Sequence, residues 1–167
     1  MYKEFEEIVD SWQIFLNEME TKMQCVIKKI LSETVKNNEI FAMFFEYEYD
    51  YMDLSFYAFD KNKNVLIQKY DLLVDELNCK TLFPMELLDK QEKTRHKYGE
   101  KEDDFDDIYA EYDEEKQDIF KIWFKSCWDK SIKEYTNIHS TYFSIHDTFF
   151  KLDLMTNKTI TDDEIWK

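Results

Sequence analysis

The chain contains almost no glycine or proline. Gly99 and Pro84 are the single examples among 167 residues. Glycine supplies the unusual backbone conformations that phosphate-binding loops, tight hairpin turns and nucleophile elbows generally need. The composition therefore argues against the enzyme classes that depend on such loops. The length fits one domain, residues 1–167, with a core of its own.

Cysteine is also scarce, and its spacing forms no recognisable motif. The three cysteines, Cys25, Cys79 and Cys127, are odd in number and far apart. This pattern predicts reduced, mostly buried thiols in a cytoplasmic protein. Cys127 lies among aromatic residues of an expected helix, without the basic surroundings that activate a thiol. We therefore expect it to fill the core rather than to act as a nucleophile.

Long apolar runs are missing. No stretch approaches the 18 residues that a membrane-spanning helix requires, and the first residues, MYKEFEEIVDSW, carry acidic groups where a signal peptide is basic. We expect a protein that neither crosses a membrane nor is exported by that route.

Basic residues are outnumbered, with 22 Lys and Arg against 37 Asp and Glu and a formal charge of −15. A negative field repels nucleic-acid phosphates and anionic lipids and speeds association with basic proteins. The charge thus indicates a basic protein partner rather than nucleic acid or membrane. An acidity that serves only solubility is the alternative.

Metal-ligand patterns are not evident. The histidines, His96, His139 and His146, match no standard zinc spacing. The acidic segment 100–118 has no central glycine, and Ile108 stands where a calcium loop places a ligand. The sequence predicts neither a metal nor another cofactor.

Aromatic residues are abundant, at 17% of the chain, and they define the expected elements. Apolar spacing of three and four predicts long helices over 2–36 and 113–135. Alternating aromatic residues predict a hairpin within 41–60, turning near 50–53, and further strands at 65–70, 141–145 and 149–154. Short helices are expected at 71–78 and 84–98, with a final turn opened by Thr161 and Glu164. The prediction is an α+β fold in which an antiparallel sheet of about five strands packs against two long helices.

The candidate partner-binding surface is an exposed acidic loop expected at 100–112. Aromatic side chains can anchor an interface, while neighbouring carboxylates attract and select basic partners. A solvated loop whose aromatic residues fold back onto the domain is the alternative. Glu46 and Glu48, expected on one strand face, are secondary candidates. The loop candidates are Asp103, Asp104, Phe105, Asp106, Asp107, Tyr109, Glu111 and Tyr112.

Three segments carry a resemblance to a known group of proteins. They are MFFEYEYDYMDLSFYAFD at 43–60, IFKIWFKSCW at 119–128 and FSIHDTFFKLDL at 143–154. Their order resembles the immunity proteins of bacterial polymorphic toxin systems, most nearly the YezG-like layout, with the SMI1/KNR4 type as second candidate. The resemblance implies a cytoplasmic protein that binds and neutralises a toxin, frequently a nuclease, made by the same cell.

Two other functions stay open. A small hydrolase or transferase could use carboxylates in a cleft, and a pocket where His139 or His146 meets a buried carboxylate would favour it. A structural subunit of an oligomer would instead expose a large apolar patch. The sequence leaves the oligomeric state open.

Overall fold

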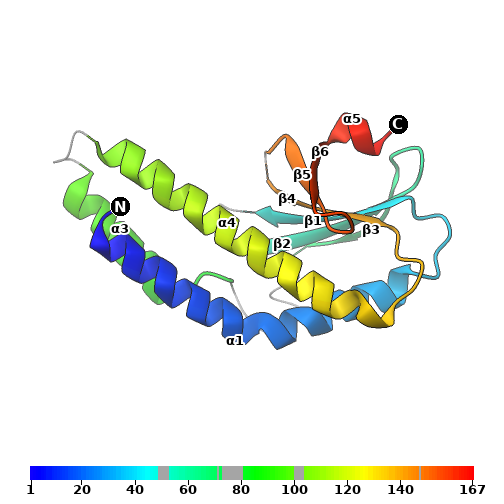
Figure 1. The fold of residues 1–167 in the computed structure, drawn as a ribbon, viewed down its shortest axis with the longest axis horizontal. Coiled ribbons are helices and arrows are strands. Elements are labelled where there is room, and N and C mark those ends of the chain that lie inside the picture. Colours follow the sequence, from blue (N-terminus) through cyan, green and yellow to red (C-terminus); the bar gives the residue numbers. More distant parts are fainter. Residues whose placement is uncertain (49–52, 71, 73–80, 100–103, 147) are drawn as a thin grey trace. The chain divides into compact units, whose positions relative to one another are not determined.

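The computed structural model describes residues 1–48, 53–70, 72, 81–99, 104–146 and 148–167. These residues form an α+β structure, as predicted, with four α-helices and a six-stranded sheet (Figure 1). A 3-10 turn, Ile132–Glu134, follows the second long helix. The elements are α1 (Lys3–Thr34), β1 (Ala42–Glu48), β2 (Asp53–Phe59), β3 (Val65–Lys69), α3 (Met85–Tyr98), α4 (Phe105–Ser131), β4 (Ser140–Ile145), β5 (Phe150–Asp153), β6 (Lys158–Thr161) and α5 (Asp162–Ile165).

The sheet differs from the predicted one in strand number and in direction. Its order is β3-β2-β1-β4-β5-β6, and β1 pairs with β4 in parallel, whereas the other neighbouring pairs are antiparallel. The prediction of an antiparallel sheet of about five strands is therefore matched only roughly. Parallel pairing needs a long connection, which the chain between β1 and β4 provides. Strand β6 has only four residues. In so short a strand the alternation of apolar and polar residues is too brief to predict the strand from the sequence.

The chain divides into two compact units. Unit 1 comprises Met1–Glu20 and Phe83–Phe124, and unit 2 comprises Thr21–Leu82 and Lys125–Lys167. Helices α1 and α4 each contribute residues to both units. The single domain expected from the chain length stays a prediction.

Unit 1 is helical, and stacked aromatic rings fill its interior. Phe5 of α1 stacks on Tyr112 of α4, with ring centroids 4.3 Å apart. Tyr2 stacks on Tyr98 at the end of α3, with centroids 4.0 Å apart. Helix α3 also meets the first turn of α1, where Lys97 Nζ donates to Glu4 Oε1 at 2.6 Å. The predicted helix 84–98 is confirmed within one residue.

Unit 2 contains the sheet and its main core. One sheet face carries Phe45, Phe56 and Phe143, all buried, and the Phe45 ring meets Trp128 of α4 edge-on with centroids 6.0 Å apart. The predicted hairpin is confirmed, because β1 and β2 pair in antiparallel register. Residues 49–52, which contain the expected turn, lie outside the described part of the chain, as does most of the helix expected at 71–78.

The opposite face of the sheet, called here the outer face, carries a smaller apolar cluster. Its buried members are Ala42, Phe44, Tyr142 and Ile165, and Trp166 packs against them. Helix α5 closes over this cluster from the end of β6. The predicted capping box is present, since the Thr161 backbone N–H donates to Glu164 Oε2 at 2.8 Å.

The two described cysteines differ in burial. Cys127 is fully buried, as predicted, but Cys25 is exposed, so the expectation of mostly buried thiols is wrong for Cys25. Cys79 lies outside the described residues.

Among the helices that the structure describes, none combines the length and apolarity needed to cross a bilayer.

Candidate functional site

The predicted acidic loop is largely a helix. Helix α4 begins at Phe105, eight residues before the expected start, so the loop assigned to 100–112 is wrong from Phe105 onward. Asp104 occupies an exposed turn immediately before the helix, and Asp103 lies outside the described residues. Acidic residues in a first helical turn are favoured by the helix dipole, which explains why so acidic a segment can be helical.

The helical period separates the aromatic candidates from the acidic ones. Phe105 and Tyr112 are buried and Tyr109 is half-buried, whereas Asp106, Asp107 and Glu111 are exposed. The Phe105 ring lies near Phe5, with centroids 6.5 Å apart, and the Tyr112 hydroxyl donates to Gln91 Oε1 at 2.8 Å. Phe105 and Tyr112 therefore belong to the core of unit 1 and are not surface anchors.

The exposed carboxylates of α4 form a continuous stripe. We call this stripe the acidic face; its members are Asp104, Asp107, Glu111, Glu114, Glu115 and Asp118. They recur at intervals of three or four residues, which places them on one side of a helix. Ile122 continues the stripe with 67% of its surface exposed, so an apolar side chain borders the carboxylates.

Two members of the acidic face have ion-pair partners. Glu111 Oε2 lies 3.9 Å from the amino-terminal nitrogen, and Asp118 pairs with Lys121 one helical turn later. Exposed pairs of this kind contribute little to stability. They nevertheless lower the local negative charge at Glu111 and Asp118.

Negative charge is concentrated in unit 1. Its residues include 20 Asp and Glu against 8 Lys and Arg, giving −12 of the total charge of −15. Unit 2, with 17 acidic and 14 basic residues, is nearly balanced. The acidity that the composition revealed is therefore a property of one unit.

A buried lysine underlies the acidic face. Lys116 Nζ donates to Gln91 Oε1 at 2.9 Å, lies 3.8 Å from Asp113 Oδ1, and sits 4.7 Å and 4.9 Å from the ring centres of Phe83 and Tyr112. Burial lowers the pKa of Lys116 to about 8. Only 2% of the residue is exposed, so Lys116 is part of the interior and not of a binding surface.

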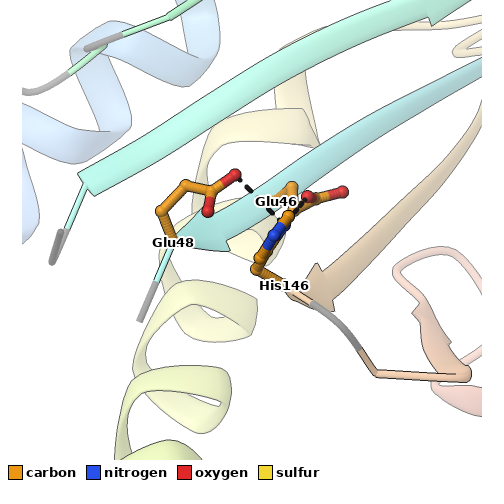
Figure 2. A group of neighbouring side chains, drawn as sticks. All are labelled: Glu46, Glu48 and His146. Carbon is orange, nitrogen blue, oxygen red and sulfur yellow. Dashed lines mark hydrogen bonds and ion pairs between the residues drawn. The ribbon is translucent and has the colours of Figure 1, made fainter. Parts of the chain in front are cut away.

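The secondary candidates, Glu46 and Glu48, lie in unit 2 on the outer face, as the alternation predicted. His146 Nδ1 lies 2.6 Å from Glu46 Oε1 and 3.3 Å from Glu48 Oε1 (Figure 2). His146 follows β4 directly, and its backbone N–H donates to the Tyr47 carbonyl at 2.9 Å. Both glutamates thus contact a histidine that was not predicted to lie beside them.

Only the parallel pairing of β1 with β4 brings these three residues together. In that register Glu46 lies opposite Ser144, two residues before His146. Part of this group could be recognised in the sequence, which has a Glu-x-Glu pair on one predicted strand and a histidine at the end of another. Which strands are neighbours could not be read from either segment.

A pocket of about 440 Å³ adjoins this group on the outer face. Lys63 Nζ lies 5.3 Å from the centre of the Trp166 ring, and Lys151 Nζ lies 3.5 Å from Asp162 Oδ1. Aromatic rings and two ammonium groups therefore border one cavity. Its lining residues are Phe44, Glu46, Tyr57, Phe59, Lys63, Lys151, Asp162 and Trp166.

The other histidines lie apart from this group. His139 Nε2 is 3.2 Å from the Thr34 carbonyl oxygen, and His96 is an exposed residue of α3. The arrangement that would favour a hydrolase, a histidine meeting a buried carboxylate in a deep pocket, is met only in part, because 46% of the His146 side chain is exposed.

Comparisons with known proteins were made at three levels. Neither the family models, nor the curated proteins, nor the solved structures gave a match to this chain.

Proposed function

We propose that the protein is a non-enzymatic binding protein that docks a basic protein partner on the acidic face of α4. The supporting observation is the placement of charge: unit 1 carries −12, and a stripe of its exposed carboxylates follows one side of a helix. Ile122, exposed at the end of that stripe, offers an apolar contact beside the charges.

The physical basis of this proposal is electrostatic complementarity. Rows of like charge steer an oppositely charged partner toward the surface and disfavour wrong partners. Because these charges face solvent, their attraction is screened beyond about 8 Å at physiological salt. Binding on the acidic face should therefore weaken strongly as salt rises.

The partner class that we propose is a toxin domain made by the same cell, which the protein neutralises in the cytoplasm. The resemblance of segments 43–60, 119–128 and 143–154 to polymorphic-toxin immunity proteins motivates this choice. Nuclease toxins bind a polyanion and are commonly basic, which agrees with an acidic inhibitor surface.

The first test is the neighbouring gene, which we expect to encode a large secreted protein; the second test uses the C-terminal domain of that protein. Its affinity for the full chain is measured by calorimetry at about 50 mM and about 500 mM NaCl. The variant Asp107→Asn/Glu115→Gln removes two charges from the acidic face, and the matched control Glu39→Gln/Asp163→Asn removes two exposed charges from unit 2. We leave Glu111 unchanged because it lies near the amino terminus.

We expect the Asp107/Glu115 variant to bind at least tenfold more weakly at low salt, and the control variant to bind as the unmodified chain does. Equal affinity at both salt concentrations, or equal loss in both variants, would contradict docking on the acidic face. A neighbouring gene for a metabolic enzyme instead of a secreted toxin would contradict the immunity role.

A further inference from the structure

The outer face of unit 2 brings together three side chains of the kinds that bind metal ions. Glu46, Glu48 and His146 each offer one ligand atom, and these atoms lie within 4.8 Å of one another. We call them the Glu–Glu–His group. Figure 2 shows the two carboxylates approaching the imidazole ring from β1.

The His146 nitrogen lies about as far from each carboxylate as ligand atoms lie from one another in a coordination shell. Nitrogen and oxygen ligands bind Zn²⁺ at about 2.0–2.2 Å, so neighbouring ligand atoms around one tetrahedral ion are about 3.3–3.6 Å apart. The observed separations from His146 Nδ1 are 2.6 Å to Glu46 and 3.3 Å to Glu48. Glu46 Oε1 would move away from His146 Nδ1 by about 0.7 Å to admit an ion, a shift that rotation of the glutamate side chain can supply.

The backbone of the sheet fixes the positions of the three residues. Glu46 and Glu48 are two residues apart on one strand, so both side chains point to the same face. His146 is held to β1 by its N–H bond to the Tyr47 carbonyl oxygen. Two of the three residues therefore lie on a paired strand, and the third is in a turn that a backbone hydrogen bond ties to that strand.

A buried hydroxyl beside the group provides an independent observation. Ser144 is the parallel neighbour of Glu46 and therefore projects to the same face. Only 3% of Ser144 is exposed, and its Oγ has no hydrogen-bond partner among the residues that the structure describes. A buried hydroxyl without a partner is unfavourable, and a water molecule bound to a nearby ion would supply one.

From this geometry we infer that Glu46, Glu48 and His146 bind a divalent transition-metal ion such as Zn²⁺ or Mn²⁺. Imidazole nitrogen with carboxylate oxygen suits these ions, whereas Ca²⁺ and Mg²⁺ prefer oxygen ligands throughout. The ion binds the Nδ1 lone pair of the neutral imidazole that carries its proton on Nε2. An imidazolium releases its Nδ1 proton to solvent on binding, and a neutral ring protonated on Nδ1 gives up that proton and takes one from solvent on Nε2. Because His146 is partly exposed, water molecules would fill the coordination positions of the ion that the three side chains leave open.

Glu46 also lines the 440 Å³ pocket, so the ion would lie at the edge of that cavity. A small ligand with an anionic group could then contact the ion and the aromatic walls together. This inference concerns unit 2 and is independent of the docking surface proposed on α4.

The experiment is a calorimetric titration of the full chain with ZnCl₂ alone, in about 150 mM NaCl and about 5 mM MgCl₂ to suppress binding to scattered carboxylates. We expect one Zn²⁺ to bind per chain. His146→Gln and Glu48→Gln should each weaken binding at least tenfold. The matched control is His96→Gln, which removes an exposed histidine in unit 1.

Histidine side-chain NMR of the unmodified protein provides a readout that does not depend on a variant folding. Zn²⁺ should shift the His146 signals and leave those of His96 unchanged. Unshifted His146 signals, a stoichiometry that rises continuously with added Zn²⁺, or unchanged affinity in His146→Gln would each overturn the inference.

Discussion

At the residue scale, Lys116 is the buried group with the clearest consequence for stability. An ammonium group in an unfolded chain has the ordinary lysine pKa of 10.5, whereas burial lowers the pKa of Lys116 in the folded protein to about 8. Between these two values the unfolded chain binds more protons than the folded one. The free energy of unfolding therefore rises with pH across this range, opposite to the usual trend for a lysine with an exposed ion-pair partner.

We predict that the lysine contributes about 2 kcal/mol more stability at about pH 9.5 than at about pH 7.5. The measurement is urea unfolding of the unmodified chain and of Lys116→Met at both pH values. The difference in the free energy of unfolding between the two proteins removes the contribution of other titrating groups, including the buried tyrosines. A difference that does not change with pH would show that Lys116 titrates normally in the folded protein.

At the element scale, α4 shows how one helix separates core packing from surface charge. Tyr112 is fully buried against Phe5 and Gln91, while Asp107 faces solvent little more than one turn earlier. Because the two residues are close along the chain, both were predicted to belong to one surface. Spacing at 3.6 residues per turn, rather than proximity, decides which side chains share a face.

We therefore predict that Tyr112→Ala lowers the free energy of unfolding by about 3–5 kcal/mol, as other large-to-small changes at buried aromatic positions do. Asp107→Asn should change it by less than about 0.5 kcal/mol. Chemical denaturation followed by far-UV circular dichroism measures both. Comparable stability of the two variants would mean that Tyr112 is not a core residue.

At the scale of the whole molecule, the uneven charge should make stability depend on salt. Unit 1 carries −12 on 62 residues, and like charges at this density repel one another. We predict that raising NaCl from about 20 mM to about 300 mM increases Tm, because salt screens this repulsion. Thermal unfolding followed by circular dichroism provides the measurement. Asp107→Asn/Glu115→Gln should reduce the increase, and a Tm that falls over this range would contradict the argument.

Short stretches of the sequence are enough to predict the local elements, and the composition gives the overall acidity. Helix α1, the β1–β2 hairpin, β3, α3 and the cap of α5 all follow from periodicity or capping residues within short segments. These features depend on interactions between residues close along the chain, which is why the pattern predicts them. The early start of α4 was missed because its charge density suggested a loop, although Phe105 and Tyr112 recur at helical spacing.

Which of these elements become neighbours depends on tertiary packing. The parallel pairing of β1 and β4 joins segments about a hundred residues apart and places His146 beside Glu46 and Glu48. Packing of α3 on α4 likewise buries Lys116 against Gln91. Such contacts depend on the packing of whole faces, so neither segment alone specifies its partner. The acidity read from the composition thus became a charged face on one helix in unit 1, while the glutamates of β1 became part of a histidine-containing group in unit 2.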